Sequence, residues 1–175
     1  PVGKKGLKAS DVPIPKNLRA ALNDPVYGPQ WRHAVDKEIC NLQDNDTWEV
    51  VTIPSPKPKS IDTTYAFRCK RHESDVVCWE DFRARCVVRG FQQIPGPNYE
   101  ETYAPVVRGV SLRMQLGDAV SREAYVATLD VKSAFLQSEI DKEIYLKPFQ
   151  GIKLPAGMQL NDVLLKLRKS MYGLK

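Results

Sequence analysis

Two alternating runs separated by a short polar segment constrain the fold of this chain more than any other feature. The first run is Thr64–Lys70 and the second is Val76–Val88, with His72–Asp75 between them. Alternation with a period of two is typical of half-buried strands, and two such runs around a short turn predict an antiparallel hairpin. The aromatic residues of the first run share one face, whereas Arg68 and Lys70 share the other.

The second run also has a basic face, because Arg83 and Arg85 lie two residues apart. A solvated strand face is the default interpretation of such an alternation. The formal net charge of +5 and the pI near 9.0 favour a polyanionic partner. That indication is weak, because 21 acidic residues are mixed among 26 basic ones.

The four cysteines leave two interpretations open. They form no CxxC pair, which argues against a zinc site. If Glu73–Ser74 is a two-residue turn, Cys69 and Cys78 face each other across the hairpin, within reach of a disulfide after slight relaxation. The alternative is four buried free thiols in an intracellular protein.

The rest of the chain predicts an α+β fold, with antiparallel strands and helices in separate blocks. Residues 1–15 contain no apolar period and are expected to form a flexible arm, so the domain is expected to cover residues 16–175. No run of about 18 apolar residues exists, so no membrane span is expected. The expected elements are a helix from Pro29 to Asp44–Asn45, a strand at Thr47–Ile53, a polyproline-like loop at Pro54–Lys59, a helix at Val110–Ala124, a strand at Tyr125–Val131, a helical turn at Ser133–Ser138 and an antiparallel pair at Glu143–Lys147 and Val163–Leu167.

One carboxylate, Asp130, lies in the short apolar stretch Leu129–Leu136, with Phe135 five residues later. A nucleotidyl-transfer site presents its first metal ligand in this way, but it needs further carboxylates to hold two ions roughly 3.5–4 Å apart. No Asp-Asp pair follows in these 175 residues. Taken alone, Asp130 is equally well interpreted as a helix cap, and Phe135 as a core residue.

Six segments, taken in order, resemble the reverse transcriptase domain of copia-type LTR retrotransposons. They are Trp31–Val50, Phe82–Gln93, Asn98–Val107, Leu129–Leu136, Glu143–Leu146 and Lys169–Lys175. The second segment is similar to the family's YKARLVARGFTQ strand, the fourth to LDVKTAFL and the last to KSLYGLK. The resemblance covers about residues 18–175. It implies a partial right-hand polymerase fold, with the fingers and the first palm strand.

The resemblance also implies roles around Asp130, which matches the family's first catalytic Asp, a ligand of Mg²⁺. The backbone carbonyl of Val131 matches an additional metal contact. Phe135 matches the aromatic residue that packs under the incoming sugar and excludes a 2′-OH. Mg²⁺ prefers hard oxygen ligands of this kind.

On the basic strand, Arg85 matches the family's fingers arginine that contacts the triphosphate. Its planar guanidinium suits that role because it holds phosphate oxygens bidentately. Arg83 shares this substrate-binding assignment. Arg89 and Lys70 extend the basic face toward a nucleic-acid backbone, which predicts salt-dependent binding.

Two functions remain open for the chain. The first is a copia-type RNA-directed DNA polymerase domain that is catalytically incomplete, because the family's Tyr-x-Asp-Asp segment is absent from these residues. For it we expect no stable Mg²⁺ binding, no activity of this chain alone and an intracellular location. The alternative is a domesticated, effector-like binding protein, secreted in one version, that reuses the fingers fold to bind nucleic acid or a partner protein. The unpaired edge of the Tyr125–Val131 strand further suggests a dimer.

Overall fold

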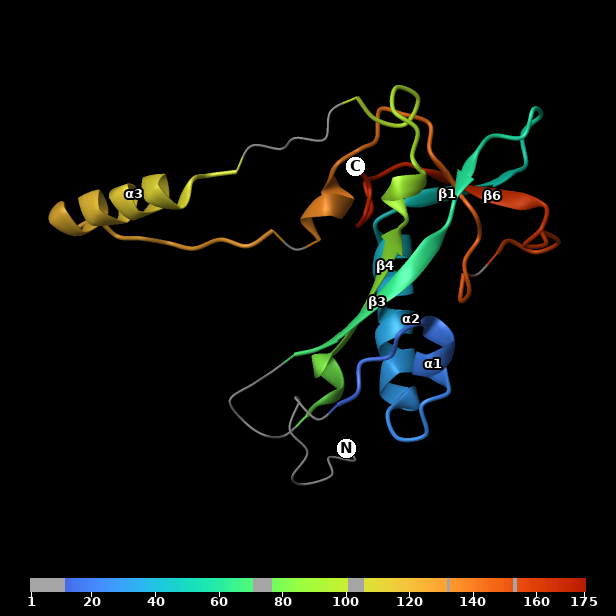
Figure 1. Cartoon of the computed structure of the whole chain (residues 1–175), viewed down its shortest axis with the longest axis horizontal. Helices are drawn as coiled ribbons and strands as arrows, with labels where there is room; N and C mark the ends of the chain where they lie inside the picture. Colours follow the sequence, from blue (N-terminus) through green and yellow to red (C-terminus); the bar gives the residue numbers. More distant parts are fainter. Residues whose placement is uncertain (1–11, 71–76, 101–105, 132, 153) are drawn as a thin grey trace.

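The computed structural model describes residues 12–70, 77–100, 106–131, 133–152 and 154–175 (Figure 1). Two helices lie along a long two-stranded ribbon, a four-stranded sheet lies at the far end of that ribbon, and a third helix stands away from this body (Figure 1). The predicted α+β class is confirmed. The elements are α1 (Leu18–Leu22), α2 (Gly28–Asp44), β1 (Trp48–Thr52), β2 (Ser60–Ile61), β3 (Thr63–Cys69), β4 (Phe82–Val88), α3 (Gly109–Ser121), β5 (Tyr145–Leu146) and β6 (Val163–Leu167), with short 3₁₀ helices η2 (Trp79–Asp81), η3 (Gly90–Gln92) and η4 (Ala134–Gln137).

Helix α2 forms where its apolar periodicity predicted it, and it ends at Asp44. Pro29 lies in its first turn, where a missing N–H costs nothing. The buried residues recur every three or four positions and face the ribbon. Trp31 is fully buried, and its ring contacts those of Phe67 and Phe82 edge-on, with centroids 5.4 and 4.7 Å apart. The short helix α1, which the sequence patterns do not predict, packs beside α2.

The predicted hairpin is present as the antiparallel pair β3–β4. One face of the ribbon is buried against α2 and the other is exposed, as the alternation of the two strands requires. The buried side chains belong to the hydrophobic core. They are Tyr65, Cys69, Phe82, Ala84, Cys86 and Val88.

The register of this hairpin differs from the one expected. Cys69 lies opposite Phe82, not opposite Cys78. Cys78 precedes η2, which takes up residues that the expected two-residue turn would have placed in the strand. The expected turn at Glu73–Ser74 lies outside the described residues. The register therefore does not support the geometric argument for a Cys69–Cys78 disulfide, and in this structure the four cysteines are unpaired, with Cys40 and Cys78 exposed.

The four-stranded sheet has the order β1-β6-β5-β2 and is antiparallel except for β2–β5. The expected strand at Thr47–Ile53 and the expected pairing of β5 with β6 are both confirmed. Asp62 joins this sheet to the ribbon, because it lies between β2 and β3. Its side chain accepts a hydrogen bond from Gln92 Nε2 at 3.0 Å and pairs with Lys147 Nζ at 2.9 Å.

The expected helix at Val110–Ala124 is present as α3, but none of its residues is buried. Its apolar side chains at Leu112, Leu116 and Val120 are exposed. Figure 1 shows α3 apart from the body of the molecule. The helix therefore forms from its own local preferences, without a packing partner among the described residues.

The expected strand at Tyr125–Val131 is wrong, because these residues are exposed and pair with no strand of the described chain. An extended segment becomes a strand only when a neighbouring backbone exchanges hydrogen bonds with it. The first palm strand implied by the resemblance is therefore not formed here. The dimer interface expected at the edge of that strand loses its structural basis.

The beginning of the chain is only partly described. Residues 1–11 of the expected arm lie outside the described residues, whereas Val12, within the expected arm, is buried against the core. Among the residues that the structure describes, no helix has the length and apolar character needed to span a membrane.

Candidate nucleic-acid interface

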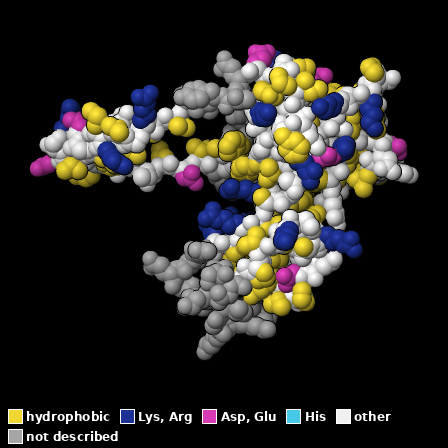
Figure 2. Space-filling view, in the orientation of Figure 1, with side chains coloured by type: hydrophobic (Ala, Val, Ile, Leu, Met, Phe, Trp, Pro, Cys, Tyr) yellow, Lys and Arg dark blue, Asp and Glu magenta, His cyan; other side chains and the backbone are white. Residues whose placement is uncertain are grey.

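The exposed face of the β3–β4 ribbon carries a row of positively charged side chains. Arg68 and Arg83 are direct cross-strand partners, and Arg85 follows two residues along β4. Lys70 and Arg89 extend the row beyond the ends of the two strands, and all five side chains belong to exposed residues. Figure 2 shows Lys and Arg side chains gathered beside the ribbon. We call these five residues the basic face.

No acidic group forms an ion pair with the basic face among the described residues. Neither β3 nor β4 contains an acidic residue, and none of the five cations forms an ion pair with a described carboxylate. Asp62 lies near Arg89, but Gln92 and Lys147 hold its carboxylate and lower its pKa. The positive field of the basic face is therefore directed to solvent.

Arg85 and Phe135, two of the residues predicted from the sequence, are brought together by a third residue, Tyr172. The Arg85 guanidinium lies 4.8 Å from the centroid of the Tyr172 ring. The Phe135 ring lies 5.2 Å from the same ring, at an interplanar angle of 59°. We call these three side chains the aromatic–arginine cluster. Its members come from β4, η4 and the C-terminal segment, and Figure 1 shows η4 beside that segment.

The aromatic–arginine cluster is held in place by backbone contacts. The Val88 N–H donates to the Tyr172 carbonyl at 2.7 Å, so the C-terminal segment lies along the outer edge of β4. Gly173 has φ +90°, and a Cβ there would meet the Val88 carbonyl oxygen at 2.2 Å. A Cβ on Gly90 would meet the Gly173 carbonyl oxygen at 2.1 Å. Only glycines allow this close approach of the two backbones.

Phe135 is presented to solvent by the anchoring of its neighbour. Leu136 is fully buried, whereas Phe135 is 58% exposed. The chain after η4 then runs beside the segment that follows β6, because Ser170 N–H donates to the Ser138 carbonyl at 2.9 Å and Ile140 N–H to the Arg168 carbonyl at 3.1 Å. These contacts place η4 next to the segment that carries Tyr172.

Behind the basic face, Glu38 of α2 satisfies an edge hydrogen bond of β4. Its Oε1 accepts from Cys86 N–H at 3.1 Å. Burial raises the pKa of the Glu38 carboxyl, and the Cys86 hydrogen bond and the charge of Arg85 partly offset that rise. Glu38 was not singled out in the sequence, because no local pattern distinguishes it from a solvated helix residue.

Asp130 and Val131, the predicted metal-binding residues, are exposed in an extended segment. Among the described residues, no three His, Cys, Asp or Glu side chains gather where they would hold a metal ion. The arrangement does not fit a pair of Mg²⁺ ions, which needs several carboxylates. Asp130 is therefore a single candidate ligand, and we assign it no step.

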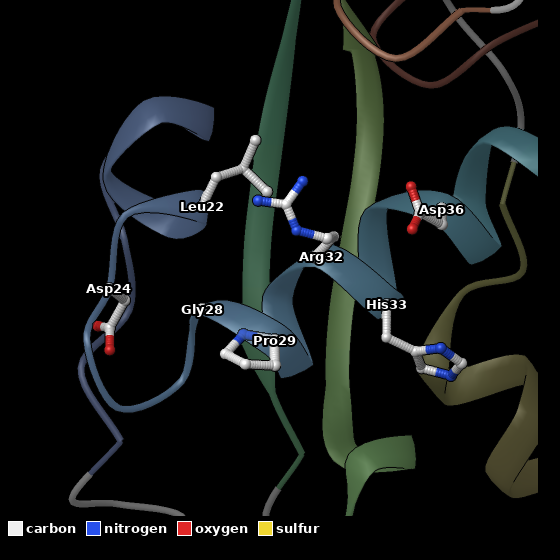
Figure 3. A pocket seen from close by; sticks show the side chains of 7 residues that line it. All are labelled: Leu22, Asp24, Gly28, Pro29, Arg32, His33 and Asp36. Atoms are coloured by element: carbon white, nitrogen blue, oxygen red, sulfur yellow. The ribbon is translucent and has the colours of Figure 1, made fainter.

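A hollow of about 400 Å³ lies elsewhere, on the outer side of α1 and α2 (Figure 3). None of the residues predicted from the sequence lines it. Its polar side chains are Asp24, Arg32, His33 and Asp36. Asp24 is occupied by the turn before α2, because its Oδ1 accepts from the N–H groups of Val26 and Tyr27. The hollow shares no residue with the basic face, and its lining contains two acidic side chains.

The order of motifs points to a class, the reverse transcriptases. Residues 45–175 match the family described as reverse transcriptase (RNA-dependent DNA polymerase), and the chain belongs to that family. Within it, the chain is a reverse transcriptase domain of the copia type, as its relatives show.

Three plant transposon proteins illustrate this relationship. The chain is 36% identical to the retrovirus-related Pol polyprotein from transposon RE2 of Arabidopsis thaliana, across 83% of the chain. It is 35% identical to that from transposon TNT 1-94 of Nicotiana tabacum across 95% of the chain, and 34% identical to that from transposon RE1 of Arabidopsis thaliana across 92%. The aligned residues make up only 10–12% of each polyprotein. No solved structure matches the chain.

Proposed function

We propose that this chain supplies the nucleic-acid-contacting part of a copia-type reverse transcriptase, and that its basic face carries the contact. The observation that supports this most directly is the row of five exposed cations along β3 and β4 and just beyond their ends, without an acidic residue on either strand. Cations that neutralise backbone phosphates release counterions, and this term supplies most non-specific nucleic-acid binding.

The aromatic–arginine cluster adds a second contact to this proposal. In this proposal Arg85 binds phosphate oxygens and Phe135 contacts the sugar or base of the same ligand, as the matching family residues imply. A guanidinium pairs well with phosphate, and an exposed aromatic ring stacks on bases of any sequence. Along β4 and just beyond it, Arg83 continues the phosphate-binding row on one side of Arg85 and Arg89 on the other, and Lys70 continues it beyond β3.

We also propose that these 175 residues alone do not carry out nucleotidyl transfer. Among the described residues, Asp130 belongs to no group of three or more His, Cys, Asp or Glu side chains that could hold a metal ion. The reaction requires at least two carboxylates to hold its metal pair. The alternative, a non-catalytic binding protein derived from this fold, shares the basic face, and no described feature favours it over the polymerase assignment.

The proposal is tested with fluorescence anisotropy on a labelled single-stranded DNA and on an RNA–DNA hybrid. The double variant Arg83→Glu, Arg85→Glu is expected to weaken binding by more than about tenfold at low salt, because it reverses two phosphate contacts. The matched control is Arg32→Glu, Lys37→Glu, which makes the same charge change on the exposed side of α2. Equal losses in the two variants, or no loss in the first, would overturn the assignment of the basic face.

A further inference from the structure

Tyr172 occupies the centre of the aromatic–arginine cluster, although no role was predicted for it. Its ring contacts the Arg85 guanidinium on one side and the Phe135 ring on the other. Among the described residues, no other hydrogen bond, ion pair or ring contact uses the side chain of Tyr172 or of Arg85. The Tyr172 ring is therefore the one direct side-chain contact of Arg85 among the described residues, and the Glu38 carboxylate adds only a charge interaction.

The position of the Tyr172 ring is set by its backbone and not by Arg85. The Tyr172 carbonyl accepts from Val88 N–H, and the next residue, Gly173, is locked against the Val88 carbonyl. Val88 is three residues from Arg85 on the same strand. The ring is thus attached to the strand that carries the arginine, and it forms a fixed surface for that flexible side chain.

Stacking on a ring leaves the hydrogen-bonding capacity of an arginine intact. The contact uses the face of the guanidinium plane, whereas the N–H donors lie in that plane and remain open to phosphate oxygens. An exposed arginine without such a restraint loses rotamer freedom when it binds. A ring that already restricts the guanidinium reduces that loss and so strengthens phosphate binding.

We propose that Tyr172 is a positioning residue that orients Arg85 for a phosphate group of the bound ligand. This inference rests on the proposed function, since it assumes that the basic face binds a phosphate-bearing ligand. The phosphate belongs either to a nucleic-acid backbone or to a free nucleotide. The structure assigns the shared chemistry, and the test separates the two sources.

The test is a double-mutant cycle on binding of a labelled oligonucleotide, with Arg85→Gln as one change and Tyr172→Leu as the other. Tyr172→Leu alone is expected to weaken binding about two- to fivefold, the range of an exposed cation–π contact. Tyr172→Phe is expected to retain wild-type affinity, because it keeps the ring. In the Arg85→Gln background, Tyr172→Leu is expected to cause no further loss.

Competition by unlabelled dTTP distinguishes the two sources of phosphate. If dTTP displaces the oligonucleotide, and if Tyr172→Leu makes that displacement weaker, the cluster is assigned to a free nucleotide. If dTTP does not compete, the cluster is assigned to the nucleic-acid backbone. Equal losses from Tyr172→Leu with and without Arg85 would overturn the positioning role. If Arg85→Gln itself has no effect on binding, the proposed function of this site fails first. If Tyr172→Leu does not fold, Tyr172→Met replaces it in the double-mutant cycle, with the same expected and contradicting results.

Discussion

Two glycines that are far apart in the sequence meet at one junction beside the basic face. Gly90 follows β4, and Gly173 lies in the segment that carries Tyr172. Their backbones approach so closely that neither position accommodates a Cβ without a shift of a backbone carbonyl. These residues belong to two of the segments that resemble the copia family, so the junction gives a physical reason for glycine at both positions.

Replacing Gly173 with Ala is expected to destabilise the chain by about 1–3 kcal/mol. The new Cβ would clash with the Val88 carbonyl, and φ +90° is strained for any residue other than glycine. The measurement is urea unfolding followed by circular dichroism. Gly117→Ala in α3 is the control, since nothing lies within 4 Å of its added Cβ and alanine favours a helix. Equal stability of the two variants would contradict the proposed interlock.

Glu38 gives a prediction for pH dependence. Its pKa is raised by burial, so the folded state binds its proton more tightly than the unfolded state does. Stability linked to this proton is present below the unfolded pKa and is lost as the pH rises through the folded pKa. Glu38→Gln keeps an oxygen that accepts from Cys86 N–H and removes the charge.

The Glu38→Gln variant is therefore expected to be more stable than the wild type at neutral pH. The difference should shrink as the pH falls through the acidic range where Glu38 becomes protonated. Urea unfolding at about pH 4 and pH 7.5 measures it. A difference that is the same at both pH values would show that burial of the charged carboxyl is not its cause.

At the scale of elements, the positions of helices and strands were predicted better than the pairing between strands. The apolar periodicity of α2 and the alternation of β1, β3 and β4 located these elements, because both signals are carried by neighbouring residues. The hairpin register was not predictable, since η2 places three residues in a 3₁₀ helix directly before β4 without a distinctive sequence signal. The expected strand at Tyr125–Val131 failed because its pairing depends on a distant backbone.

In the candidate site too, residues with a local signal were predicted and a residue that depends on a distant contact was not. Arg83, Arg85 and Phe135 were predicted from their own segments, and the structure leaves all three exposed. Tyr172 was missed as a site residue because its role depends on a contact with β4, more than 80 residues earlier in the chain. The signal that could have found it is the KSMYGLK segment itself, since its glycine and tyrosine lie in one of the segments that resemble the copia family.

Helix α3 provides a prediction about an element without a packing partner. Leu112→Gln together with Leu116→Gln is expected to change the free energy of unfolding by less than about 0.5 kcal/mol, because both side chains are exposed. Leu165→Ala in β6 is the contrasting variant and is expected to cost about 2–5 kcal/mol, because Leu165 is fully buried in the core. A large loss from the α3 variant would show that this helix packs against the body in solution.

For the whole molecule, the account predicts binding without catalysis by these 175 residues. No primer extension is expected on an RNA or DNA template with Mg²⁺ or Mn²⁺, because Asp130 belongs to no group of three or more candidate metal ligands among the described residues. Gel analysis of a labelled primer makes the measurement. Extension that disappears in Asp130→Ala would prove the prediction wrong and restore Asp130 to a working metal site.

The central claim is that the basic face binds nucleic acid through phosphate contacts, and the salt dependence of binding tests it most directly. The logarithm of the dissociation constant is measured against the logarithm of salt concentration for the wild type and for Arg83→Gln, Arg85→Gln. The account predicts that the slope falls by about 1.4 to 1.8 in the variant, since each lost phosphate contact removes about 0.7 to 0.9. An unchanged slope would contradict the claim, whatever the affinity.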